Sequence, residues 1–228
     1  MFKLVTIFLF ISLSNFVSAN EFKFQVNYLH FRAESDQAAF PSSVVYDPAP
    51  QLEVSYKFHF LKKNFLGLGV SYAQLEPDST NANLFIEQDK FDDIGVEAFY
   101  SYLFANGIRL KVLGGLRSFP LYEINGISLR FSDFLPVYYG LGIALVTVNK
   151  LGVLRGEYVY KHINKESSGN DEWQGYEQNL SLDYNFKWQK SAWGVYFNYG
   201  FSLLKSENNN EFKTDIRSLG LYYKLRLK

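Results

Sequence analysis

Apolar and polar side chains alternate along the segment Arg217–Lys228 at the end of the chain. A period of two residues is typical of a β-strand, in which successive side chains point to opposite faces. One face of this strand is apolar, while the other carries glycine and polar residues and therefore does not belong to a dry core. The apolar side chains are Leu219, Leu221, Tyr223, Leu225 and Leu227.

The same alternation recurs along the chain and predicts ten strands. Each has a length close to the ~9–11 residues with which a tilted strand crosses a bilayer. The predicted strands are Glu21–Phe31, Gln51–Phe60, Phe65–Leu75, Asp93–Phe104, Ile108–Arg117, Pro136–Val148, Leu151–Lys161, Gln174–Lys187, Ala192–Leu204 and Asp215–Leu227.

The connections between these strands alternate between long polar segments and tight turns, which is typical of barrels with long outer loops and short periplasmic turns. Asn149-Lys150 is predicted to be a two-residue turn that pairs Val148 with Leu151. The turn before Ile108 is predicted to place Gly107 at positive φ. Eight or twelve strands are the alternatives, because the connection Ser118–Leu135 also alternates, at Ile127, Leu129 and Phe131.

Composition narrows the fold class. Aromatic residues make up 18% of the chain, yet its mean hydropathy is only −0.13. No segment after the N-terminus has the roughly 20 apolar residues of a spanning helix. These features favour an all-β protein, a single transmembrane antiparallel β-barrel. The alternative is a soluble β-sandwich or lipocalin-like barrel, in which the apolar faces would form the core.

The N-terminus indicates export. A positive start at Met1–Lys3, an apolar run Leu4–Val17 and a small residue at Ala19 predict a signal peptide over residues 1–19, with the barrel over 20–228. The chain has no cysteine, which excludes disulfides and thiolate metal sites. Its formal net charge is zero, so nothing favours nucleic-acid binding. No metal or cofactor is expected.

The faces opposite the apolar ones would line the lumen, and they carry charges of both signs near mid-depth. We expect long side chains of opposite charge to pair across the lumen and plug it. A narrow pore or a small polar-ligand site is the alternative, and the excess of Lys and Arg would favour anions. The predicted lumen cluster is Lys57, Glu97, Lys111, Arg155, Glu157, Asp183 and Lys224.

The last strand also resembles the C-terminal assembly signal of bacterial outer-membrane β-barrel proteins, with Ser218, Gly220, Tyr223 and Leu225 at the positions of the pattern. The resemblance implies the outer membrane of a Gram-negative bacterium, recognition by the barrel-assembly machinery, and contact with outer-membrane lipid and lipopolysaccharide. A monomer is expected.

A second segment, Glu157–Asn164, is similar to the region around the active site of PagL-type lipid A 3-O-deacylases. The resemblance implies that His162 would be the base, but Asn164 stands where that family has its serine nucleophile. Ser167 and Ser168 lie further along, outside the motif. No catalytic residue is therefore assigned. The preferred function is a structural or surface-interaction barrel; a narrow channel for small ions or solutes and a lipid A or phospholipid deacylase are the alternatives.

The outer loops are expected to carry any partner-binding surface. Apolar residues in Arg32–Pro50 (Phe40, Val44, Val45, Tyr46) and Glu76–Asp92 (Leu84, Phe85, Ile86) are predicted to pack over the barrel mouth, whereas Lys205–Thr214 is predicted to be a polar, mobile loop.

Overall fold

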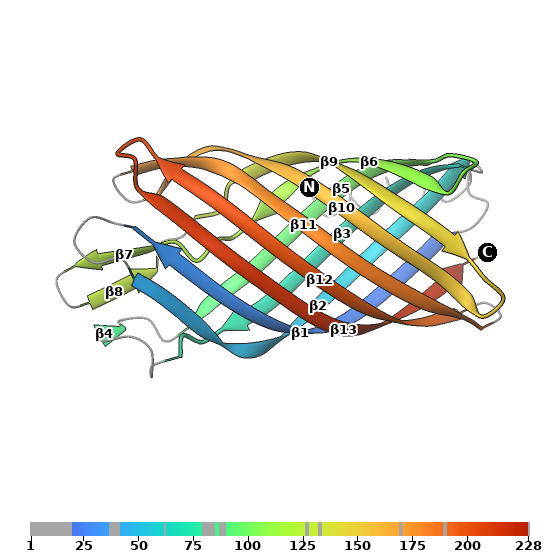
Figure 1. Cartoon of the computed structure of the whole chain (residues 1–228), viewed down its shortest axis with the longest axis horizontal. Coiled ribbons are helices and arrows are strands. Elements are labelled where there is room, and N and C mark those ends of the chain that lie inside the picture. Colours follow the sequence, from blue (N-terminus) through green and yellow to red (C-terminus); the bar gives the residue numbers. More distant parts are fainter. Residues whose placement is uncertain are drawn as a thin grey trace, which may run out of the picture.

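The computed structural model describes residues 20–36, 42–61, 63–78, 85–86, 90–125, 128–131, 134–168, 171–188 and 191–227. Within them, ten antiparallel strands close into one barrel (Figure 1). The first strand pairs with the last to complete the ring. The barrel strands are β1 (Asn20–Ser35), β2 (Ser42–Leu61), β3 (Asn64–Leu75), β5 (Phe91–Leu103), β6 (Ile108–Arg117), β9 (Val137–Val148), β10 (Gly152–Ser168), β11 (Asp171–Trp188), β12 (Ser191–Ser206) and β13 (Glu211–Leu227).

The predicted all-β barrel of ten strands is confirmed. Among the described residues, no helix is long and apolar enough to cross a membrane. The predicted signal peptide, residues 1–19, lies outside the described residues. Tight turns and the end of β13 gather at one end of the barrel, here called the turn end, and the longer connections at the other, the wide end (Figure 1).

An apolar belt surrounds the part of the barrel nearer the turn end. Its side chains point outward and are largely exposed, as on Val26 (54%), Leu141 (64%) and Leu221 (62%). A belt of this kind suits the hydrocarbon of a bilayer and would be costly in water. The soluble alternative is wrong, because in a soluble barrel or sandwich these apolar faces would be buried as the core.

Many strands are longer than predicted. Part of the way along them, the apolar side chains change from the outward face to the inward face. On β1, the inward side chains change from polar at Gln25 and Asn27 to buried and apolar at Leu29 and Phe31. The outward side chains change in the opposite sense, and Arg32 is exposed. Apolar and polar residues still alternate along the strand, but the apolar ones now face inward and the polar ones outward. The wall therefore extends beyond the apolar belt, with polar side chains on its outer face and apolar side chains packed inside.

This exchange corrects the prediction for Arg32–Pro50, most of which belongs to β1 and β2. Val44 and Tyr46 are buried because they point inward from β2, not because a loop folds over the mouth. Phe40 and Leu84 lie outside the described residues. The predicted mobile loop Lys205–Thr214 is also mostly strand, since only a short turn separates β12 from β13.

The turn before β10 differs from its predicted position. Val148 pairs with Val153, not with Leu151. The Asn149 side chain accounts for the difference, because its Oδ1 accepts hydrogen bonds from the backbone N–H groups of Leu151 (2.9 Å) and Gly152 (2.7 Å). The register moves by two residues, so every side chain stays on its predicted face.

The turn between β5 and β6 is as predicted. Gly107 has a φ of 83°, and the Phe104 N–H donates to the carbonyl oxygen of Ile108 at 2.8 Å.

The segment Ser118–Leu135 does not extend the wall. It contains the hairpin of β7 (Tyr122–Asn125) and β8 (Ser128–Phe131), and β8 also pairs with β4 (Phe85–Ile86). These strands form a separate small sheet at the wide end (Figure 1). Phe119 pairs with Phe134 at the base of the hairpin, and both rings are buried. Of the alternating apolar residues, Phe131 is buried at the mouth, while Ile127 lies outside the described residues.

Candidate functional site

The lumen contains a polar cavity of about 400 Å³. All seven residues of the predicted lumen cluster line it: Lys57, Glu97, Lys111, Arg155, Glu157, Asp183 and Lys224. They do not form one connected group. The charged side chains of the lumen are arranged in three levels, which differ in how well each charge is paired.

The middle level contains most of the predicted cluster. Lys111 Nζ lies 2.7 Å from Glu97 Oε1 and 3.9 Å from Glu157 Oε1. Lys161 Nζ lies 3.5 Å from Glu97 Oε2, to which the Tyr138 hydroxyl also donates at 3.2 Å. Glu97 thus contacts two cations and a hydroxyl. Such paired neighbours offset the desolvation cost of a charge inside the barrel.

Arg155 and Asp183 continue this level on the neighbouring strands β10 and β11. The Arg155 Nε atom lies 2.6 Å from Asp183 Oδ2, in an ion pair whose N–H does not point at that oxygen. Arg155 also lies 3.5 Å from Glu157. The Tyr222 hydroxyl donates to Asp183 at 3.0 Å. Both carboxylates are therefore held by partners and not free in the cavity.

A second level, closer to the wide end, was not assigned to the cluster from the sequence. Arg117 lies 2.9 Å from Glu177 and 3.3 Å from Asp93. Lys161 Nζ contacts Glu177 at 3.1 Å and so links the two levels. Glu177 and Asp93 are only 1% and 2% exposed. The inward positions of Arg117 and Glu177 follow from alternation, but their pairing depends on a barrel-wide register.

The third level, at the turn end, is a basic chamber formed by Lys57, Arg109, Lys224, Arg226 and Glu21. Glu21 is the one described carboxylate within 4.0 Å of these cations, at 3.9 Å from both Lys224 Nζ and Arg226 Nε. Lys57 and Arg109 have no ion pair within 4.0 Å to any described residue. Both cations lie instead over the Phe65 ring, at 4.3 Å and 5.0 Å from its centroid.

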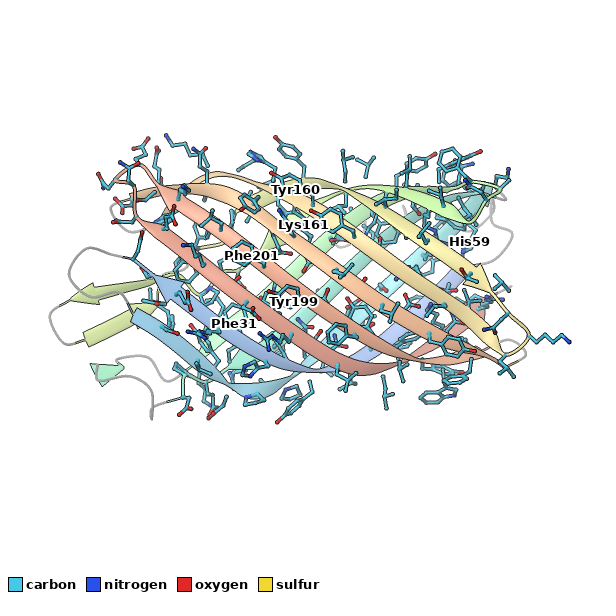
Figure 2. All side chains as sticks on the ribbon, viewed as in Figure 1. Phe31, His59, Tyr160, Lys161, Tyr199 and Phe201 are labelled. Carbon is cyan, nitrogen blue, oxygen red and sulfur yellow. The ribbon has the colours of Figure 1, made fainter. Side chains whose placement is uncertain are left out.

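An apolar plug fills the lumen between the second level and the wide end. It is formed by residues from many strands and from the segment before β7. Figure 2 places Phe31 toward this end and His59 toward the turn end. Its described members include Leu29, Phe31, Tyr46, Leu75, Phe119, Phe134, Ile163, Trp173, Leu204 and Phe212, each 4% exposed or less. The sequence analysis placed some of these apolar residues in loops over the mouth, whereas the structure places them on strands with their side chains inside the barrel.

Two of the lumen glycines lie against aromatic rings. A side chain at Gly67 would overlap the Phe99 ring at 2.2 Å, and one at Gly115 would overlap the Tyr138 ring at 2.9 Å. They make room for aromatic rings. The Phe99 ring in turn lies 4.7 Å from the Lys111 ammonium.

The four residues of the predicted assembly signal lie on β13. Ser218 and Gly220 face the lumen, while Tyr223 and Leu225 lie on the outward face. Their recognition by assembly machinery stays a prediction.

His162 lies on the outward face of β10, between Tyr139 of β9 and Tyr176 of β11. Its ring is 5.0 Å from that of Tyr139. Ser167 and Ser168 follow a register shift after Ile163 and pair with Glu172 and Asp171. An acyl hydrolase needs a nucleophile within reach of its base. The neighbours of His162 in the sheet are aromatic rings, as in an interfacial girdle.

No described group of three or more His, Asp or Glu side chains is arranged to hold a metal ion.

Neither a scan of protein-family models nor a search of curated proteins finds a match to the chain. Solved structures do resemble it. The outer-membrane protease OmpT from Escherichia coli has a TM-score of 0.56 and 8% identity, over 92% of this chain and 97% of that one. An outer-membrane channel from Pseudomonas putida F1 has a TM-score of 0.52 and 10% identity, over 92% and 96%.

Identities this low show the fold alone, and proteins of one fold have different functions. The closed ten-stranded wall, the outward apolar belt and these likenesses agree with one another. The chain has the fold of the small β-barrel proteins of Gram-negative outer membranes.

Proposed function

We propose that the protein is a closed outer-membrane barrel that acts as a scaffold for surface interactions and does not conduct solutes. The apolar plug is the observation that carries this proposal. Phe31, Trp173 and Phe212 belong to different strands, and their side chains are 2%, 4% and 0% exposed. An ion would have to leave water to pass such a section, which is very costly.

The levels of paired charge support the same proposal. Arg117 bridges Asp93 and Glu177 across the lumen, and Lys161 bridges Glu177 and Glu97. These contacts join β5, β6, β10 and β11 directly. They occupy the section that a passing ion would need.

The strand extensions beyond the apolar belt supply the interaction surface. Their outward faces are polar and their inside is packed, so they form a rigid rim that would stand above the bilayer. Function on such scaffolds is usually carried by loops and exposed edges. Lipid and lipopolysaccharide around the belt, the assembly machinery at β13, and a monomeric state belong to this proposal.

Planar-bilayer recording of the refolded full chain tests the closed lumen. Near silence is expected for the wild type. Truncation of the plug by Phe31→Ala with Phe212→Ala should introduce conductance, whereas Leu141→Ala on the lipid-facing side should not. Steady ion-selective currents from the wild type that change in Arg155→Gln would refute the proposal.

That result would favour a narrow channel, the second candidate. Two observations favour it: the polar cavity of about 400 Å³ and the similar fold of the Pseudomonas putida channel.

A further inference from the structure

The basic chamber at the turn end has a charge imbalance that the other two levels lack. It contains Lys57, Arg109, Lys224 and Arg226, and Glu21 is the one described carboxylate within 4.0 Å of any of them. Glu157 and Asp183 of the middle level act on Arg109 from further away. Elsewhere in the lumen each carboxylate has a cation within 4.0 Å and most cations have a carboxylate as close. An unbalanced group of cations inside a low-dielectric barrel is destabilising unless an anion joins it.

We propose that the basic chamber is a binding site for a small phosphate-bearing anion. Arg109 is the central donor, because it has no ion pair and its Nε has no hydrogen-bond partner among the described residues. A guanidinium keeps its charge at any ordinary pH and presents a planar fork of N–H groups that matches the oxygens of a phosphate.

Lys57 supplies a second charge beside Arg109. The Phe65 ring, 4% exposed, lies under both cations and holds them on one side of the chamber. On another side, Lys224 and Arg226 share Glu21 at 3.9 Å, longer than a hydrogen-bonded pair. An anion between the two sides would contact cations from β2, β6 and β13.

The chamber is exposed toward the turn end. The side chain of Arg226, near the end of β13, is 64% exposed, whereas that of Lys224 is 13% exposed. Exposure thus falls with depth from the turn end. In the other direction the cavity continues past the ion-pair levels to the described residues of the apolar plug. The chamber is the turn-end part of the lumen cavity of about 400 Å³, whose lining also includes both ion-pair levels.

Isothermal titration of the refolded full chain with inorganic phosphate at low salt tests the site. Saturable one-site binding is expected. Arg109→Gln should weaken it at least about tenfold, because a hydrogen bond to a charged group is lost. Glu21→Gln should tighten it by removing the carboxylate that lies nearest to Lys224 and Arg226. Arg217→Gln is the matched control, since Arg217 lies on the outside of the barrel beside Asp215 and should not matter.

Glycerol 3-phosphate serves as a second probe. Tighter binding than that of inorganic phosphate would indicate a phosphoryl group on a small molecule, and weaker binding the free anion; both support the site. The proposal is overturned by the absence of saturable binding, or by equal losses in Arg109→Gln and Arg217→Gln. If Arg109→Gln does not fold, Glu21→Gln decides, because unchanged or weaker binding in that variant also overturns it. The outcome is independent of whether the barrel conducts.

Discussion

Arg117 is the side chain whose loss should destabilise the barrel most among the lumen charges. It lies on β6, and its guanidinium contacts Glu177 at 2.9 Å and Asp93 at 3.3 Å. The side chains of these carboxylates are 1% and 3% exposed, and that of Arg117 is 15% exposed. The perturbation we consider is Arg117→Gln, which removes the charge and keeps much of the side-chain volume.

The size of the loss in folding free energy depends on the partners that each carboxylate retains when Arg117 is replaced. Glu177 retains Lys161 at 3.1 Å. Among the described residues, Asp93 keeps only the Gln51 amide at 3.5 Å, a weak contact, and no cation within 4.0 Å. Breaking a buried ion pair from one side costs about 3–5 kcal/mol. Because one of the two carboxylates stays paired, we expect the lower end, about 3 kcal/mol, which is roughly a hundredfold in the folding equilibrium.

Unfolding by guanidinium of the barrel refolded in lipid vesicles, followed by tryptophan fluorescence, measures this loss. The double variant Arg117→Gln with Asp93→Asn should recover part of it, because the orphaned charge is then gone. Arg217→Gln is the control: this arginine lies 3.1 Å from Asp215 with its side chain 62% exposed, and such pairs contribute no more than ~1 kcal/mol. A loss in Arg117→Gln no larger than in Arg217→Gln would refute the argument.

Three further predictions concern the turns, the plug and the rim. Gly107→Ala should impair refolding, seen as loss of heat-modifiable gel migration, because its φ is 83° and the new Cβ would lie 2.5 Å from a carbonyl oxygen; Gly156→Ala, whose Cβ would have 3.9 Å of clearance, should refold normally. Trp173→Ala, at a site 4% exposed, should lower the free energy of unfolding by about 3–5 kcal/mol in the same vesicle assay. Limited proteolysis of intact cells should cut first after Glu207, in the exposed turn between β12 and β13, and should spare the chain around buried Tyr46; early cutting near Tyr46 would contradict the packed rim.

Much of the wall could be predicted from the sequence, because strand alternation is a local property. A residue's face depends only on whether its number is odd or even within the strand. The turn at Asn149 shifts the register by two residues, so the predicted faces are still correct there. The same parity placed Lys57, Arg155 and Lys224 in the lumen. Gly107 could be assigned its positive φ because a short turn leaves few alternatives.

The extent of the strands could not be read in this way. The rule that apolar side chains face outward holds only where the outside is lipid. Beyond the belt, at Leu29 and Phe31, the apolar side chains face inward. Sequence alone does not mark the depth at which lipid gives way to water, so segments such as Arg32–Pro50 resembled loops with scattered apolar residues.

The partner of each lumen charge was likewise decided only by the closed barrel. Arg117 and Glu177 are 60 residues apart in the chain, and they meet across the lumen because the strand order and register place them at one depth. The same geometry leaves Arg109 and Lys57 beside Phe65 with no described carboxylate within 4.0 Å. Alternation determines whether a side chain points inward or outward. Its contacts across the lumen depend on the registers of all the strand pairs around the barrel, which are set only when the barrel has folded.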